Sequence, residues 1–290
     1  MWIGLCCGAA MLYKRPTAAL MKTEQFRSLK MSGLGGLLLA IAAVNAWSGP
    51  KPLERAHAHN DYLHSRPLVD ALDQGFCSVE ADIYLVDGKL LVAHDRDKVQ
   101  PEKTLEKLYL QPLAQRVRSH GGQVFSNKAP FMLLIDIKSE AEPTYARLRE
   151  ELKKFSDILT VFTPRAIRTN AVTIVLSGNR PIETVAAERE RYVAIDGRLP
   201  DLETNPPPSV VPLVSDNWTK YFQWKGQGPL GDAERAKLRG LVKQAHEQGR
   251  RIRFWAVADR EDAWTELYSA GVDLINTDDL TGLAGFLGTK

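Results

Sequence analysis

The chain has 290 residues and a mass of 32.3 kDa, and 44% of its residues are hydrophobic while 25% are charged. This composition excludes a disordered tail, a collagen-like fibre and a polytopic membrane protein. The formal net charge is +3 and no run of lysine or arginine is present, so no nucleic-acid partner is expected. Three cysteines (Cys6, Cys7 and Cys77) are too few for a disulfide scaffold and lack the spacing of a zinc site.

Residues 1–46 have the pattern of a targeting segment. Basic residues precede a run of 14 mostly apolar residues at 31–44, which is shorter than the roughly 20 residues of a membrane-spanning helix. The run fits the apolar region of a signal peptide, and small residues around Ala46 offer a cleavage site. An uncleaved N-terminal membrane anchor is the alternative, and Met21 or Met31 is a candidate initiator. We expect an exported protein, secreted or periplasmic, whose domain spans residues 47–290.

Removing residues 1–46 would leave 33 basic and 34 acidic residues, a net charge of −1, so the positive balance belongs to the targeting segment. Cys77 would then be the one remaining cysteine, which excludes an internal disulfide. We expect Cys77 to be a small buried residue.

From Arg55 onward, β-branched apolar runs alternate with amphipathic stretches. Asp87-Gly88 predicts a tight hairpin, and Gly249 and Gly271 stand where helices should end. About eight strands interleaved with helices suit one α/β domain, a (β/α)₈ barrel. A doubly wound sheet is the alternative, but no Gly-x-Gly-x-x-Gly follows the first predicted strand. The predicted strands are 55–59, 78–86, 89–93, 131–138, 172–177, 192–196, 211–215, 251–257 and 272–276, and the predicted helices are 67–74, 143–155, 232–248 and 260–270.

Three pairs of polar residues lie two positions apart on these predicted strands: His57 and His59, Glu80 and Asp82, Asp136 and Lys138. Side chains with this spacing point to the same face of a strand. Barrel enzymes carry their sites at the carboxyl ends of such strands. The three pairs therefore predict a site at that end of the barrel.

Glu80 and Asp82 lie in an otherwise apolar strand, where two desolvated carboxylates need a cation. A divalent ion with oxygen ligands supplies that charge, and Asp136 offers a third carboxylate. The alternative is a one-residue shift that turns Glu80 and Asp82 outward. His59 and His94 each end a strand beside this segment, and imidazoles can act as acid and base.

Four ordered motifs resemble the phosphatidylinositol-specific phospholipase C and glycerophosphodiester phosphodiesterase superfamily. They are Ala-His-Ala-His-Asn-Asp-Tyr-Leu (56–63), Ser-Val-Glu-Ala-Asp (78–82), Leu-Leu-Val-Ala-His-Asp (90–95) and Leu-Ile-Asp-Ile-Lys (134–138). The His-x-His-Asn-Asp-Tyr form is most similar to the altered inheritance of mitochondria protein 6 branch. Residues 254–259 and 271–278 resemble the last two strands of the phosphodiesterases.

The resemblance implies a distorted (β/α)₈ barrel that uses one Ca²⁺ or Mg²⁺ ion to cleave phosphodiesters. It implies that His59 and His94 are the catalytic histidines and that Lys138 contacts the phosphate. His57 remains the alternative to His59, because the phosphodiesterases have one histidine followed by arginine at this strand. The implied metal ligands are Asn60, Glu80, Asp82 and Asp136, the last of which stands where these enzymes usually have a glutamate.

We therefore expect a metal-dependent phosphoric diester hydrolase that acts on a glycerophosphodiester or a phospholipid headgroup. Transient contact with a membrane surface is compatible with such a substrate, and no protein partner is expected. One alternative is a zinc-dependent amidohydrolase or phosphatase-like barrel, although His64, His120 and His246 lie in predicted loops or helices. Another is a catalytically inactive barrel that binds a lipid headgroup. Arg180 and Arg253 are expected to be surface or ion-paired arginines.

Overall fold

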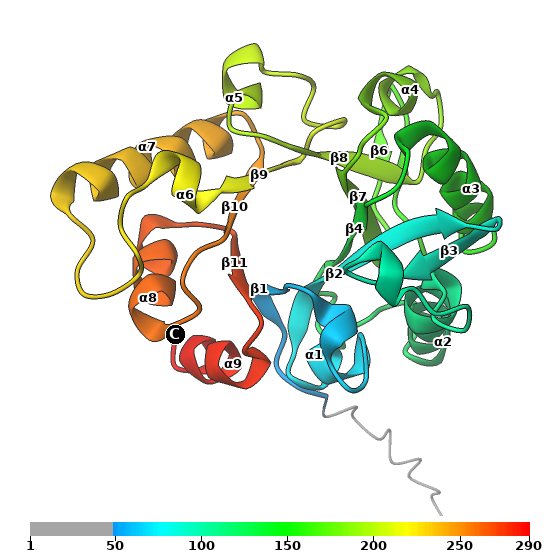
Figure 1. The fold of residues 1–290 in the computed structure, drawn as a ribbon, viewed down its shortest axis with the longest axis horizontal. Coiled ribbons are helices and arrows are strands. Elements are labelled where there is room, and N and C mark those ends of the chain that lie inside the picture. The colour runs from blue at the N-terminus through cyan, green and yellow to red at the C-terminus, as the bar shows by residue number, and fades with distance from the viewer. Residues whose placement is uncertain (1–48) are drawn as a thin grey trace, which may run out of the picture. The chain divides into compact units, whose positions relative to one another are not determined.

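The computed structural model describes residues 49–290, in which strands and helices alternate along the chain (Figure 1). Eight parallel strands form a closed barrel, because β1 pairs with both β2 and β11. The order around the barrel is β1, β2, β4, β7, β8, β9, β10 and β11. Their bounds are β1 (Leu53–Ala58), β2 (Phe76–Val86), β4 (Phe131–Ile137), β7 (Val172–Gly178), β8 (Val193–Gly197), β9 (Leu213–Asn217), β10 (Arg251–Trp255) and β11 (Leu274–Thr277).

Three further strands lie outside the ring. β3 (Lys89–Val92) runs antiparallel to the extended end of β2. The turn between them is the predicted Asp87-Gly88 hairpin, in which both residues have positive φ, 48° and 72°. β5 (Val161–Phe162) and β6 (Ile167–Arg168) form a separate two-stranded sheet.

Helices surround the barrel (Figure 1). Those predicted from periodicity begin and end within two residues of their expected positions, and the nine predicted strands do as well. Gly271 caps α8 with φ +88°, as expected of a helix-ending glycine. The α-helices are α1 (Val69–Asp73), α2 (Gln111–Ser119), α3 (Ala141–Lys153), α4 (Ile182–Ala187), α5 (Asp201–Thr204), α6 (Trp218–Tyr221), α7 (Asp232–Glu247), α8 (Glu261–Ala270) and α9 (Leu280–Gly288), with short helical turns at Asp61–Leu63, Arg96–Lys98 and Glu106–Leu110.

α9 is a helix that the sequence pattern did not predict, because it contains three glycines. The side chain of Asp279 caps its first turn by accepting a hydrogen bond from Gly282 N at 2.9 Å. A Cβ at Gly282 would clash with Asp279 and Trp264, so glycine permits this close packing. Leu283 and Leu287 bury the other face. Tertiary packing here outweighs low helix propensity.

The buried apolar side chains of the strands pack in two separate clusters. Val79, Ala81 and Ile83 of β2 belong to the large core that also contains buried helical side chains. A small separate cluster comes from the alternate faces of four strands: Met132, Leu134, Val175, Leu213 and Leu274. Glu80 and Asp82 share the inward face, so the outward alternative for this pair is wrong. The barrel interior therefore contains both apolar and polar side chains, since Leu134 is the cross-strand partner of Glu80.

Two expectations about the rest of the chain have different outcomes. Cys77 is buried, as expected of a small apolar residue. The expected targeting segment, with Cys6 and Cys7, lies outside the described residues. Within residues 49–290, no helix has the length and apolar character needed to cross a membrane.

Candidate functional site

Three carboxylates converge at the carboxyl end of the barrel. Glu80 and Asp82 come from β2, and Asp136 comes from β4, where it is the direct cross-strand partner of Asp82. Each offers one oxygen, and these oxygens all lie within 4.8 Å of one another. We call these three residues the acidic cluster. It brings together three of the four predicted metal ligands.

The positive groups near the acidic cluster do not neutralise all of its negative charge. Burial and the nearby Glu80 raise the pKa of Asp82 to about 6. Burial also raises the pKa of Asp136, although Lys138 opposes this shift. Asp82 Oδ1 is buried and has no hydrogen-bond partner within the described part of the chain. Converging oxygens with an unpartnered buried acceptor fit a hard divalent cation.

Glu80 is paired on its other side with Arg253 of β10. Arg253 Nη1 lies 3.0 Å from Glu80 Oε2, and both side chains are buried. Burial alone would raise the pKa of Glu80, but Arg253 and a hydrogen bond with His57 lower it well below its usual value. Arg253 is thus an ion-paired arginine, as expected, and it keeps Glu80 ionised.

His57 lies in the barrel interior, away from solvent. Its Nδ1 is 2.7 Å from Ser78 Oγ, and its Nε2 faces Arg253 and lies 3.2 Å from Glu80 Oε2. Burial and the positive charge of Arg253 lower the pKa of His57 to about 3, so the ring is neutral. Both ring nitrogens already have partners, and one of them faces a guanidinium, an arrangement that suits neither zinc binding nor substrate contact.

His59 lies just beyond β1, where it is partly exposed. Its Nδ1 is 2.9 Å from Asp278 Oδ1, just after β11, and 2.9 Å from Asn60 Nδ2. Burial would lower the pKa of His59, but the hydrogen bond and negative charge of Asp278 raise it overall. Of the histidine pair on the first strand, His59 is therefore the one that solvent reaches.

His94 lies near the acidic cluster on the loop after β3. Its side chain is 55% exposed, and its Nδ1 is 3.4 Å from Asp82 Oδ2. The hydroxyl of Tyr62 connects these groups, because it donates to Asp82 Oδ2 at 2.7 Å and lies 3.1 Å from His94 Nδ1. Burial, followed by Asp82, raises the pKa of Tyr62 far above its usual value, which keeps it a hydroxyl.

Asn60, the fourth predicted ligand, has left-handed backbone with φ 49°. Its Oδ1 lies 2.7 Å from the oxygen of the Tyr62 hydroxyl. The same hydroxyl contacts Asp82, so Asn60 borders the acidic cluster. The adjacent Asp61 is fully buried and anchors this loop, accepting from Leu68 N at 2.5 Å and from the Tyr109 hydroxyl at 2.9 Å.

Lys138 follows β4 and bridges two members of the acidic cluster. Its Nζ lies 3.2 Å from both Asp82 Oδ2 and Asp136 Oδ1. Burial would lower the pKa of Lys138, but the two carboxylates raise it overall, so the ammonium is retained. Gly178 at the end of β7 makes room for Asp136, because a Cβ there would clash with Asp136 Oδ1.

Two residues of this site were not among the sequence-based candidates. Asp278 stands within the motif at 271–278, and Tyr62 stands within the motif at 56–63. The signal for Asp278 is a carboxylate that follows the last strand, since β11 pairs with β1 and brings it to His59. Tyr62 has no comparable signal, because its hydroxyl reaches Asp82 only through the fold of the loop.

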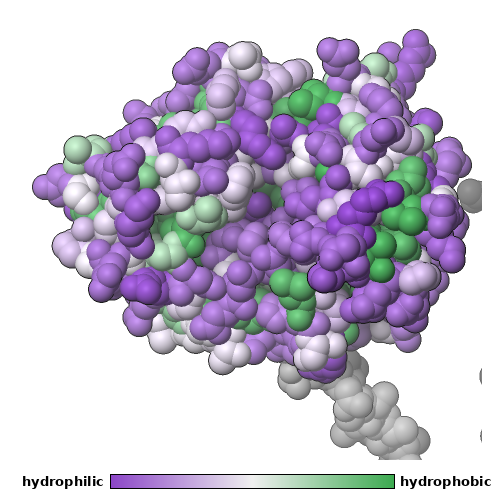
Figure 2. Space-filling model, viewed as in Figure 1, coloured by the Kyte–Doolittle hydropathy of each residue, from purple (hydrophilic) through white to green (hydrophobic). Residues whose placement is uncertain are grey.

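The site lies among polar surroundings. On the face that Figure 2 presents, hydrophilic residues surround the hollow at the centre of the molecule. Among residues 49–290, the group of His, Cys, Asp and Glu side chains close enough to hold a metal ion is the acidic cluster, and it contains no histidine. The arrangement is thus three carboxylates, one ammonium and two accessible imidazoles. It offers charge for a divalent ion and groups able to move protons.

Comparison with protein families gives two matches. Residues 50–196 match the model of the AIM6-like phosphodiesterase domain, and residues 251–281 match the glycerophosphoryl diester phosphodiesterase family. The chain is 30% identical to altered inheritance of mitochondria protein 6 of Kluyveromyces lactis, covering 81% of this chain and 72% of that protein. It is 25% identical to a homologue from Arthroderma benhamiae, over 79% and 82% of the two chains.

Solved structures show the same fold at low sequence identity. A calcium-dependent phosphoinositol-specific phospholipase C from Pseudomonas sp. is 15% identical with a TM-score of 0.53, covering 81% of this chain and 92% of that one. A glycerophosphodiester phosphodiesterase from Parabacteroides distasonis is 16% identical with a TM-score of 0.50, over 83% and 99%. The expected barrel is therefore confirmed. The chain belongs to the AIM6-like phosphodiesterase family and is a phosphoric diester hydrolase.

Proposed function

We propose that this enzyme hydrolyses a glycerophosphodiester or the headgroup linkage of a phospholipid, with one Ca²⁺ or Mg²⁺ ion held by the acidic cluster. The observation that carries the proposal is the convergence of Glu80, Asp82 and Asp136 within 4.8 Å. Asp82 Oδ1 is buried and has no hydrogen-bond partner among residues 49–290, so it is an acceptor available to the ion. A bound ion would also offset the charge that raises the pKa of Asp82.

The ion would be held by the acidic cluster, with the amide oxygen of Asn60 beside it. Such an ion polarises phosphoryl oxygens and stabilises negative charge in the transition state. Lys138 supplies a second positive charge, which suits it to contact a phosphate oxygen next to Asp82 and Asp136. These groups would together bind and orient the diester.

The two accessible histidines supply the proton transfers. We assign His59 as the general base that removes a proton from the attacking water, with Asp278 stabilising the resulting imidazolium. One P–O bond forms to the water oxygen, and the P–O bond to the leaving alcohol breaks. His94 donates a proton to the departing alkoxide, so the products are a phosphomonoester and an alcohol.

The test is hydrolysis of glycerophosphodiesters and phosphoinositides by the full chain, with and without a chelator. We expect chelation to abolish turnover and added Ca²⁺ or Mg²⁺ to restore it. His94→Ala should lower kcat by about 100-fold or more. His120→Ala, on the loop after α2, is the matched control and should keep activity within about twofold.

Two results would contradict this mechanism. Turnover that is insensitive to chelator would show that the reaction does not need the ion. Full activity in His94→Ala would show that His94 is not the acid or base of the reaction. Absence of turnover on every diester, combined with binding of a lipid headgroup, would instead support the inactive binding barrel.

We also propose that residues 1–46 direct export and that the enzyme works outside the cytoplasm. Support comes from the apolar run at 31–44 and the small residues near Ala46. The mass of the protein recovered from its native host tests this proposal. A chain beginning at Trp47 is expected, and a chain that retains residues 31–44 would contradict cleavage.

A further inference from the structure

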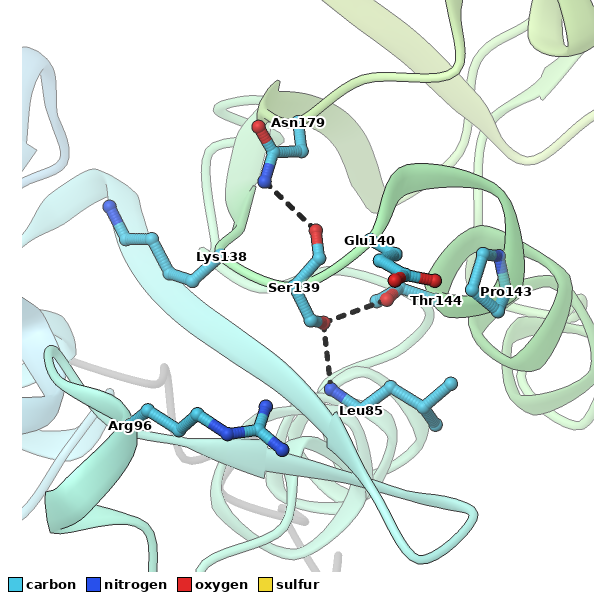
Figure 3. A pocket seen from close by; sticks show the side chains of 8 residues that line it. All are labelled: Leu85, Arg96, Lys138, Ser139, Glu140, Pro143, Thr144 and Asn179. Carbon is cyan, nitrogen blue, oxygen red and sulfur yellow. Dashed lines mark hydrogen bonds between the residues drawn. The ribbon is translucent and has the colours of Figure 1, made fainter.

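Cavities lie at both ends of the barrel. The polar cavity beside Lys138, with a volume of about 490 Å³, belongs to the candidate site at the carboxyl end (Figure 3). A second cavity, of about 260 Å³, lies at the opposite end, where the strands begin. Its wall includes Phe131 and Met132 at the start of β4, Thr173 near the start of β7, and Arg251, the first residue of β10. We call it the amino-end cavity, and the length of the strands separates it from the acidic cluster.

Most of the wall of the amino-end cavity is apolar. Met132 belongs to the small separate apolar cluster, and its cross-strand partner is Thr173. Phe162 of β5 and Ile167 of β6 line the cavity from outside the ring of strands. Thr173 Oγ1 lies 2.9 Å from Thr160 Oγ1, so these two hydroxyls are partners of each other. The cavity therefore offers a ligand mainly contact with apolar side chains.

Arg251 is the charged residue of this wall. Its Nη2 donates to Glu54 O at 3.0 Å and to Asp273 O at 3.4 Å, whereas its Nε and Nη1 make no hydrogen bond to residues 49–290. The carboxylate of Asp273 is engaged elsewhere, since its Oδ2 lies 2.8 Å from His246 Nε2. Burial lowers the pKa of Arg251, although the negative charge of Asp273 opposes this shift. The guanidinium thus has donors to spare and a positive charge that its surroundings do not fully balance.

These features fit a small ligand with an apolar body and a single negative charge. A carboxylate accepts charge-assisted hydrogen bonds from a guanidinium, which are stronger than bonds between neutral groups. A phosphate monoester would bring up to two charges, and an apolar wall with one arginine leaves the second uncompensated. An apolar cavity of about 150 Å³ can hold benzene, so a volume of about 260 Å³ suits a ligand of roughly ten non-hydrogen atoms.

We propose that the amino-end cavity binds a medium-chain aliphatic carboxylate, with its chain among Met132, Phe162 and Ile167 and its carboxylate accepting hydrogen bonds from Arg251. Octanoate is a carboxylate of this size. The site lies at the other end of the barrel from the acidic cluster, and the inference does not depend on the proposed function.

The test is calorimetric titration of the full chain with sodium octanoate at pH 7.5. Wild type should bind it with a Kd of about 0.1 mM or tighter. Arg251→Met should weaken this binding about tenfold or more, because the carboxylate loses its charged donor while the apolar wall is retained. Octan-1-ol has the same chain without the charge. It should bind wild type more weakly than octanoate does, and Arg251→Met should change its affinity less than about threefold.

A second variant keeps the test decisive if Arg251→Met does not fold. Ile167 is 46% exposed, so Ile167→Asp changes the wall of the cavity without removing a core side chain. The new carboxylate should weaken octanoate binding about tenfold, because it repels the ligand and removes apolar contact. Arg168→Met is the matched control, since it replaces the next residue of β6, outside the cavity. It should leave the affinity within about twofold.

Three results would contradict the proposal. The first is that wild type does not bind octanoate at concentrations up to about 10 mM. The second is an affinity for octanoate that neither Arg251→Met nor Ile167→Asp changes, or an affinity for octan-1-ol equal to that for octanoate. The third is competitive inhibition of diester hydrolysis by octanoate, which would place the ligand at the acidic cluster. An unchanged KM for the diester in saturating octanoate is the expected result.

Discussion

The guanidinium of Arg253 and the carboxylate of Glu80 form an ion pair inside the barrel, with Nη1 3.0 Å from Oε2. The pair joins β10 to β2 across the interior, and it neutralises one of the three carboxylates that converge there. Lys138 is shared between the other two. The acidic cluster is therefore left with more negative than positive charge, which is the charge state that a divalent cation can complete.

Arg253→Met should destabilise the fold by about 3 kcal/mol, because it leaves Glu80 buried without its partner. Urea denaturation in the presence of chelator measures this change. Arg168→Met, which breaks the exposed pair with Glu190, should cost less than about 1 kcal/mol. A loss for Arg253→Met no larger than that control would show that the buried pair contributes little.

Asp278→Asn should lower the pKa of His59, because it removes the negative charge that raises it. The limb of the kcat/KM profile that depends on His59 should then move to lower pH. Activity at neutral pH should fall about tenfold or more, since the imidazolium loses its stabilising partner. An unchanged pH profile would show that Asp278 does not set the pKa of His59 during catalysis.

Gly178→Ala should weaken ion binding although it replaces none of the proposed metal ligands. The new Cβ would clash with Asp136 Oδ1, and alanine is strained at φ +68°. Calorimetric titration with Ca²⁺ or Mg²⁺ should show an affinity at least about tenfold lower, in line with the effect of displacing a ligand's support. Gly88→Ala is a matched control at positive φ in the β2–β3 hairpin, where a Cβ meets nothing within 4 Å. Equal affinities in the two variants would contradict the role of Gly178.

Ion affinity should depend on pH with a midpoint near the raised pKa of Asp82, about 6. As pH falls through this value, Asp82 takes up a proton, and the proton competes with the ion for the same carboxylate. Affinity at pH 5 should therefore be about tenfold weaker than at pH 7.5. Constant affinity across this range would contradict the involvement of Asp82.

Much of the fold and part of the site could be predicted from the sequence because they follow from local periodicity. The spacing of Glu80 and Asp82 in an apolar strand places both side chains on one face, and their predicted need for a cation favours the interior for that face. α9 was missed since three glycines lower its propensity, while its stability comes from contacts with distant residues. Local pattern carries no information about such contacts.

The two histidines of the first strand show that local sequence pattern is limited in the same way within the site. Spacing places His57 and His59 on one face, but it does not distinguish depth along the barrel. His57 is the last residue but one of β1 and is enclosed by Ser78 and Arg253, whereas His59 lies past the end of β1 next to Asp278. Depth depends on partners from β2, β10 and β11, which only the assembled barrel brings together.

The most direct test of the central claim is a calorimetric titration of the full chain with Ca²⁺ and with Mg²⁺ at pH 7.5, comparing wild type with Asp82→Asn. Wild type should bind one ion, and the variant should bind it at least about 100-fold more weakly, because a charged ligand becomes a neutral amide. Equal binding in the two proteins, or no binding of either ion to wild type, would contradict the account.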